Sequence, residues 1–462
     1  MRRWLSILLL LIPSVAALAD NVRLPDYERV VLPNGAVLLI AGKHDVPLVG
    51  LEVVIRGGAV TDPPGREGLS SLAAQMLEKG AGERSAAEFA EAVESVGGSL
   101  SVDGGREAVS ISAEFLARDA NLMVELVAEM LQRPQLDSGE FEKLRKRRID
   151  LIRAAKDGDP SGLVPAYRDA FLFGEHPYGA PPDGSEDSLA AISHKDLRQY
   201  YENHIGGDRL IIAAVGDFDV AAMRTLLSLA FGEWRPAAAS LPTVAAASRR
   251  TGRHVLLVDK PGATQTYFTI ANVGVAIDFP ERPALDLANT VFGGRFTSML
   301  NSELRVRTGL SYSAWSSLVR PSRPGALAIT SFTETGTTVD AIDLALATLG
   351  RLRDEGVHVE SVVSARNYVM GQFPPRLETN AQLAGQFAML ELYGLDRSYV
   401  DAYGDALGAV TAADVRSVID AVYPPLEDLV FVLIGDAAAI REAVKKYGDV
   451  TEMPITSPRF SP

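Results

Sequence analysis

The chain has 462 residues, of which 47% are hydrophobic and 23% charged, and its formal net charge at pH 7 is −14. It contains no cysteine, which excludes disulfides, thiolate metal sites, a cysteine nucleophile and a lipid anchor on cysteine. The negative charge argues against nucleic acid and anionic membrane surfaces as partners.

Residues 1–19 are typical of a secretory signal peptide. Arg2 and Arg3 precede an apolar stretch over 4–12, and the pattern Ala-Leu-Ala over 17–19 fits a cleavage site. The alternative is a retained membrane anchor, although the apolar stretch is short for a span and no other long one follows. We therefore expect an exported protein that has no stable membrane insertion after signal cleavage.

The next stretch predicts a mixture of strands and helices. ERVVLPNGAVLLIAGKHDVP contains two β-rich runs separated by Pro-Asn-Gly, which indicates a hairpin. LVGLEVVIRGG reads as a strand that ends at Gly57 and Gly58, and GDRLIIAAVGDFD as a strand followed by a helix from about Val220. Apolar periodicity predicts helices over about 67–79, 85–96, 118–133 and 137–156.

The second half repeats this order of elements. HVLLVDKPG and TQTYFTIANVG resemble the early strands, 282–292 reads as a helix, and EDLVFVLIGD ends in a Gly-Asp pair. Gly58 and Gly274 lie 216 residues apart. Gly216 and Gly435 lie 219 residues apart, which is nearly the same offset. Two domains of similar plan, each long enough to bury its own core, are the natural interpretation.

The predicted fold class is α+β, with two similar domains related by internal duplication. In each domain we expect a mostly antiparallel sheet with helices packed on one face. A stretch rich in Ala, Ser and Pro separates the halves and reads as a linker. The expected divisions are a signal peptide at 1–19, an N-terminal domain at 20–235, a linker at 236–252, a C-terminal domain at 253–452 and a tail at 453–462.

Within the helix expected over 67–79, residues 68–77 read GLSSLAAQML, a stretch that contains no histidine and no carboxylate. Its apolar residues follow the spacing of a helix that faces a core. They are Leu69, Leu72, Ala73, Met76 and Leu77. Core packing is therefore sufficient to explain this stretch.

Segments along nearly the whole mature chain resemble the pitrilysin/insulinase family of zinc peptidases, specifically the two-domain subunits related to mitochondrial processing peptidase. They follow the family's order and approximate spacing: VVLPNGAVLLI, GEHPYGAPPDGSEDSLAAIS, LRQYYENH, LIIAAVGDFD and FGGRFTSMLNSELRVRTGLSYSAWS. The resemblance implies two α/β-roll domains that face each other across a peptide-holding chamber.

Active members of this family carry H-x-x-E-H on a helix of the first domain, where two imidazoles hold Zn²⁺ and the glutamate is the general base. By the resemblance, the histidine positions hold Ser71 and Gln75 here, and the glutamate position holds Ala74. The third ligand, a glutamate in the family, corresponds to Leu151 with Asp150 beside it. A shift of one residue would place Asp150 there, but a single carboxylate does not make a zinc site. We therefore predict no metal and no catalytic residue in this chain.

The second domain keeps a different set of family-like residues. FGG supplies Gly293 and Gly294 of a glycine-rich segment, and ELRVRTGLSY supplies an Arg and a Tyr seven residues apart, Arg305 and Tyr312. The resemblance implies that these residues contact a peptide substrate, because a guanidinium and a phenol can hold a carbonyl oxygen. The alternative is that Arg305 is a surface helix residue and Tyr312 packs as a half-buried strand residue.

The histidines and one basic run complete the candidate features. The six histidines show no i, i+3 or i, i+4 pair, and His176 in GEHPYG is expected to order a turn. No G-x-S-x-G motif supports a serine hydrolase. KLRKRR at 143–148 is expected to be a solvated helix face, with docking of an acidic partner segment as the alternative.

The function that these residues favour is a non-catalytic, substrate-binding subunit of an exported peptidase. We expect a heterodimer with a homologous chain that bears H-x-x-E-H and the zinc, while this chain supplies Arg305 and Tyr312 to the peptide. One alternative is a non-enzymatic peptide-binding or scaffolding protein of the cell envelope, and another is a self-sufficient metallopeptidase with a relocated site. The signal peptide and the resemblance together favour a Gram-negative periplasm.

Overall fold

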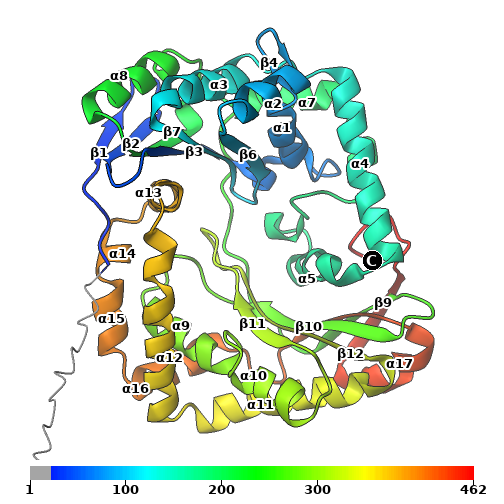
Figure 1. Ribbon diagram of the computed structural model, residues 1–462. Helices are drawn as coiled ribbons and strands as arrows, with labels where there is room; N and C mark the ends of the chain where they lie inside the picture. The colour runs from blue at the N-terminus through cyan, green and yellow to red at the C-terminus, as the bar shows by residue number, and fades with distance from the viewer. Residues whose placement is uncertain (1–21) are drawn as a thin grey trace, which may run out of the picture.

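The computed structural model describes residues 22–462, so the predicted signal peptide at 1–19 lies outside the described residues. Two halves, each built on a six-stranded sheet, face one another (Figure 1), with the N-terminal half at the top of the view. Within residues 22–462, no helix is both long enough and apolar enough to span a membrane.

The N-terminal sheet has the strand order β1-β2-β8-β3-β7-β6, and only the neighbours β2 and β8 are parallel. Along β3, alternate side chains from Val49 to Ile55 enter the core under the helices, as the two-residue period of a strand requires. The strands are β1 (Glu28–Val31), β2 (Val37–Gly42), β3 (Leu48–Arg56), β6 (Ser99–Gly104), β7 (Ala108–Leu116) and β8 (Leu210–Gly216), and a separate short pair is formed by β4 (Gly80–Ala81) and β5 (Arg84–Ser85).

The C-terminal sheet repeats this plan with the order β11-β12-β10-β13-β9-β14. Five of its strands correspond one to one in neighbour and direction with β6, β7, β3, β8 and β2, which confirms the predicted duplication. The sixth strand differs, because β14 follows all other strands in the chain and runs parallel to β9. The strands are β9 (His254–Asp259), β10 (Gln265–Val273), β11 (Ala314–Leu318), β12 (Ala326–Glu334), β13 (Val430–Gly435) and β14 (Asp449–Pro454).

Helices cover the outer face of each sheet, as predicted (Figure 1). Several begin at capping boxes, in which Ser85, Ser193 or Thr411 satisfies N–H groups of the first turn. The helices of the N-terminal half are α1 (Leu69–Leu77), α2 (Ala86–Glu94), α3 (Ala120–Gln132), α4 (Ser138–Asp157), α6 (Glu186–Ala191), α7 (His194–His204) and α8 (Val220–Phe231). Those of the C-terminal half are α9 (Arg282–Phe292), α10 (Met299–Asn301), α11 (Thr338–Glu355), α12 (Val359–Gln372), α14 (Ser398–Asp401), α15 (Tyr403–Ala409), α16 (Ala412–Val422) and α17 (Ala437–Val444).

The inner face of each sheet receives one helix from the opposite half. Helix α5 (Val164–Phe173) packs on β10 and β13, and α13 (Asn380–Tyr393) packs on β3 and β8. The second contact is close, because a Cβ added to Gly50 would lie 2.6 Å from the backbone nitrogen of Ala381. This exchange interlocks the two halves and adds a layer to the predicted arrangement of helices on one face.

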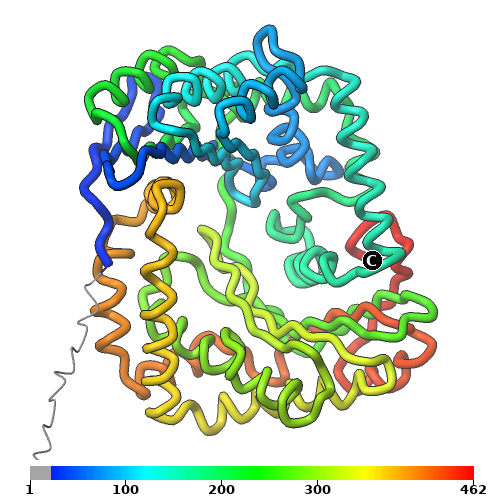
Figure 2. Tube along the Cα trace, in the orientation of Figure 1, coloured from blue at the N-terminus to red at the C-terminus, as the bar shows by residue number. Residues whose placement is uncertain are grey.

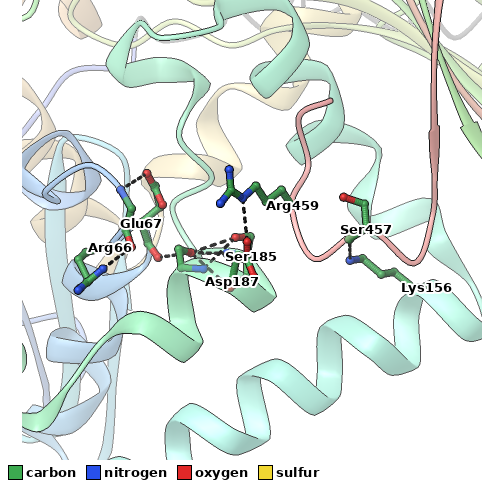
Figure 3. A network of polar contacts seen from close by, with 9 residues as sticks. Arg66, Glu67, Lys156, Ser185, Asp187, Ser457 and Arg459 are labelled. Carbon is green, nitrogen blue, oxygen red and sulfur yellow. Dashed lines mark hydrogen bonds and ion pairs between the residues drawn. The ribbon is translucent and has the colours of Figure 1, made fainter.

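A linker and the C-terminal stretch also join the halves. Residues 236–252 contain no helix or strand, and after β14 the chain returns to the N-terminal half beside α4 (Figure 2). There Arg459 forms an ion pair with Asp187 at 2.8 Å, and the Lys156 ammonium donates to the Ser457 carbonyl at 2.6 Å (Figure 3). The predicted tail at 453–462 is therefore an ordered part of the fold, and β14 includes its first two residues.

Candidate functional site

Helix α1 carries Ser71, Ala74 and Gln75, the positions that we predicted to correspond to the zinc ligands and the general base of the family. Its start is fixed by Asp62, whose carboxylate accepts hydrogen bonds from the N–H groups of Gly68 (2.9 Å) and Ser70 (2.8 Å). Burial raises the pKa of Asp62 to about 7, although these hydrogen bonds act in the opposite direction. The apolar stripe of α1 lies in the N-terminal core as predicted, and Ala74 is fully buried there. The predicted position of the general base thus holds a methyl group packed in a core.

The side chains of Ser71 and Gln75, four residues apart on α1, converge on the guanidinium of Arg148 from α4. Arg148 Nη2 donates to Ser71 Oγ (2.9 Å), and Nε donates to Gln75 Oε1 (3.2 Å). Nη1 donates to Asp183 Oδ1 (2.5 Å), and Ser71 Oγ donates to the same oxygen (3.0 Å). A guanidinium therefore lies between the two side chains at the predicted metal-ligand positions.

This arrangement does not fit a zinc ion. Arginine stays protonated and offers only hydrogen-bond donors, while a hydroxyl and an amide are poor zinc ligands. A divalent ion about 4 Å from the guanidinium would meet a repulsion of about 8 kcal/mol, twice the value for two unit charges near a protein surface. Across residues 22–462, no three His, Asp or Glu side chains lie close enough together to hold a metal ion.

The predicted third-ligand position lies further along α4 and is apolar. Leu151 is 57% exposed and lines a cavity of about 450 Å³ together with Arg148 and Phe460. Asp150, the neighbour considered as a substitute ligand, forms an ion pair with Lys146 at 2.7 Å. Asp150 is therefore already paired on the surface of its own helix.

The basic run at 143–148 is only in part the solvated helix face that we predicted. Lys143, for example, pairs with Glu140 of the same helix at 2.7 Å. Arg148, in contrast, is only 15% exposed and points toward α1. This role of Arg148 was not predicted, although its place three residues before Leu151, on the same side of α4, was a usable signal.

In the C-terminal half, Arg305 and Tyr312 contact each other next to the edge strand β11. Arg305 lies in a π-helical turn, η6 (Ser302–Arg307), and its guanidinium carbon is 4.3 Å from the centroid of the Tyr312 ring. Tyr312 is 71% exposed and precedes β11, so the alternative of a half-buried strand residue is wrong. Within residues 22–462, neither side chain takes part in a hydrogen bond or an ion pair. Their donor groups are available to a ligand.

The two predicted glycines, Gly293 and Gly294, directly follow α9 and begin the loop that leads toward these residues. A Cβ at Gly293 would lie 2.3 Å from the backbone nitrogen of Ser316 on β11, so a side chain does not fit there. The Ser316 N–H donates to the Gly293 carbonyl at 3.1 Å. Gly293 is buried and Gly294 exposed. Gly293 therefore positions the loop against β11, and only Gly294 is open to a peptide.

His176 orders a turn, as predicted. Its Nδ1 accepts a hydrogen bond from the Tyr178 N–H (3.0 Å), and its Nε2 lies 3.0 Å from the Ala245 carbonyl oxygen of the linker. Both ring nitrogens are thus used in holding the backbone. This histidine has no free nitrogen for a metal ion or for proton transfer.

Two family models match the chain. One, described as Insulinase (Peptidase family M16), matches residues 37–181, and the other, described as Peptidase M16 inactive domain, matches residues 191–369. An uncharacterized zinc protease of Streptomyces coelicolor is 24% identical over 396 residues, which are 85% of this chain and 86% of the relative. A non-peptidase homolog, YmxG, of Helicobacter pylori is 23% identical over 402 residues, which are 85% of this chain and 90% of the relative.

Solved structures share the fold. The crystal structure of a peptidase M16 inactive domain from Pseudomonas fluorescens has a TM-score of 0.83 at 20% identity and covers 89% of this chain and 98% of its own. A protease from Helicobacter pylori has a TM-score of 0.83 at 19% identity and covers 89% of this chain and 100% of its own. These relatives are named both as proteases and as a non-peptidase homolog.

Proposed function

Because the chain belongs to the insulinase family of peptidases, family M16, we propose that it is a non-catalytic, peptide-binding subunit of an exported peptidase complex. A homologous partner with H-x-x-E-H supplies the zinc and the general base, and this chain holds the peptide through Arg305 and Tyr312. One observation carries the proposal: the Arg148 guanidinium bridges Ser71 and Gln75, where a catalytic chain needs its metal ligands.

The C-terminal half supports peptide binding by its available donors. A guanidinium carries five N–H donors and a phenol one, and those of Arg305 and Tyr312 have no acceptor within residues 22–462. Both residues adjoin β11, which is an edge strand among the described strands and whose Ser316 N–H already donates to the Gly293 carbonyl at 3.1 Å. An extended peptide that passes this edge can be held by the two side chains, whose N–H and O–H groups donate to its carbonyl oxygens.

The N-terminal half offers a second edge beside the altered metal site. Strand β6 is the edge of its sheet, and a Cβ added to Gly104 at its end would lie 2.5 Å from the Ser71 Cα. A peptide along β6 would therefore pass Ser71 and the Arg148 guanidinium. It would meet hydrogen-bond donors there, and no metal-bound water, so it would be held without being cleaved.

The test is reconstitution with a zinc-bearing homologue from the same organism. We expect the two chains to co-elute in size-exclusion chromatography at micromolar concentration and to cleave peptides in a chelator-sensitive way. Arg305→Ala and Tyr312→Phe should each lower turnover roughly ten- to hundredfold without changing assembly. Arg198→Ala, at an exposed position on α7, is the matched control and should leave turnover unchanged.

Three outcomes would speak against parts of this proposal. Failure of the chains to associate would remove the heterodimer. Unchanged turnover in both variants would return Arg305 and Tyr312 to a packing role. Peptide binding by the isolated chain, with no partner-dependent turnover, would favour the non-enzymatic peptide-binding protein.

Export is proposed from the pattern of residues 1–19. Expression of the full chain in a Gram-negative host should yield a periplasmic protein whose N-terminus, read by mass spectrometry, lies near residue 20. A full-length chain that stays in the membrane fraction would instead support a retained anchor.

A further inference from the structure

Exposed aromatic rings and two arginines gather beside the Arg305–Tyr312 pair. We call Arg295, Phe296, Arg305, Tyr312 and Tyr368 the arginine–aromatic surface. Phe296 is 60% exposed, and Tyr312 and Tyr368 are also exposed. Large exposed aromatic side chains that lie together mark binding surfaces more often than isolated ones do.

Cation–π contacts order these residues. The Arg305 guanidinium carbon lies 4.9 Å from the Phe296 ring centroid as well as 4.3 Å from that of Tyr312, so the arginine is held between two rings. The Arg295 guanidinium carbon lies 6.0 Å from the Tyr368 ring centroid on α12. Rings that hold a guanidinium in this way leave its in-plane N–H donors free to bind an acceptor.

Neither arginine of the arginine–aromatic surface has a carboxylate partner within residues 22–462. Arg295 Nη1 donates to Ser364 Oγ at 3.0 Å, and its Nε is buried without any hydrogen-bond partner. A buried donor without an acceptor is costly. In a chain with a net charge of −14, two arginines of one surface that lack a carboxylate partner favour a ligand that supplies one.

The acidic residue of η6 is already committed to other arginines. Glu303 forms ion pairs with Arg307 and, at 3.0 Å, with Arg351. Partial burial would raise the pKa of Glu303, but these contacts outweigh it and lower the pKa, so Glu303 stays ionised. Glu303 therefore does not neutralise Arg305, and a carboxylate from outside the chain can.

The loop that carries Arg295 and Phe296 is fixed before any ligand binds. The Ser298 N–H donates to the Arg295 carbonyl at 3.1 Å, and Asn301 Nδ2 donates to the Phe296 carbonyl at 2.7 Å. Arg305 follows in the π-helical turn η6, a rare geometry that is frequent at functional sites. Little conformational entropy is then lost when a ligand binds, which favours affinity.

We propose that the arginine–aromatic surface recognises a carboxylate next to an apolar residue of the bound peptide, with Arg295 as the principal anchor. The carboxylate belongs either to an Asp or Glu side chain or to the C-terminus of the peptide, since both present the same two oxygens to a guanidinium. The rings contact the apolar neighbour. This inference rests on the proposed function, because it names the class of peptide that the subunit selects.

The test is isothermal titration calorimetry of the isolated full chain with four short peptides. They share one sequence that has Phe at its centre and Phe as its last residue, and they differ in having Glu or Gln beside the central Phe and a free or an amidated C-terminus. We expect about tenfold tighter binding of the peptides that carry the recognised carboxylate. The Glu/Gln comparison identifies the side chain as its source, and the acid/amide comparison identifies the C-terminus.

Arg295→Gln should abolish this preference, and Arg295→Lys should keep part of it. Arg198→Gln, the same charge change on α7, should keep all of it. The circular dichroism melting curve of each variant checks its fold. Equal binding of all four peptides, or a preference that survives in Arg295→Gln, would overturn the inference and leave the proposed function standing. Absence of binding by every peptide would overturn both.

Discussion

Replacing Arg148 with methionine tests whether its guanidinium holds α1, α4 and the loop at Asp183 together. The substitution keeps most of the aliphatic stem and removes three hydrogen bonds, to Ser71, Gln75 and Asp183. The bond to Asp183 counts for little, because that carboxylate is 71% exposed and regains water. The bonds to Ser71 and Gln75 are shielded and involve a charged donor, so their joint loss should cost about 2–3 kcal/mol.

The assay is urea unfolding followed by far-UV circular dichroism. Arg147→Met is the control, since Arg147 is the exposed neighbour on the same helix and has no ion pair within residues 22–462. We expect Arg148→Met to lower the free energy of unfolding by about 2–3 kcal/mol and Arg147→Met by less than about 0.5 kcal/mol. Equal stability of the two variants would refute the bridge as a structural replacement for the metal.

Three further predictions concern pH, packing and metal binding. Burial raises the pKa of Glu52 on β3 to about 7, although a hydrogen bond from Ser112 acts in the opposite direction. Between pH 4.5 and about 7 the folded state therefore keeps a proton that the unfolded state has lost. The free energy of unfolding falls as the pH rises through this range. Glu52→Gln should therefore stabilise the protein by up to about 3 kcal/mol at pH 8 and not at pH 4, as measured by urea unfolding; an equal effect at both pH values would contradict this. In Gly50→Ala, the added methyl group would clash with the backbone of Ala381 and push α13 away from the N-terminal sheet. We expect faster exchange of the amide hydrogens of α13, and an unchanged exchange rate would disprove the close contact. Replacing Ser71, Ala74, Gln75 and Leu151 with His, Glu, His and Glu should confer zinc binding only when Arg148 is also replaced. Zinc that binds with the arginine in place would contradict the repulsion between the guanidinium and the metal.

The elements and the duplication could be predicted because they follow from local patterns. The helix expected over 282–292 is found with the same bounds, and the one expected over 137–156 is found at Ser138–Asp157. Apolar spacing and caps are properties of neighbouring residues, so a single sequence displays them. The altered residues on α1 could be identified for the same reason, because a motif with fixed spacing shows which positions have changed.

The contacts between distant segments could not be predicted. Arg148 belongs to a run that resembles a solvated helix face, and it points inward only because α4 lies against α1 in the fold. Gly50 in the middle of a strand signalled a close approach of backbone, but the sequence did not indicate that Ala381 of the other half makes it. The same holds for Phe460, which is buried by residues that precede it by hundreds of positions.

The central claim, that a guanidinium has replaced the metal, is tested most directly by metal analysis of the isolated chain after exposure to excess zinc, with a peptide hydrolysis assay on the same sample. We predict that no stoichiometric zinc remains bound after gel filtration and that the peptides stay intact. One zinc per chain together with chelator-sensitive hydrolysis would contradict the claim.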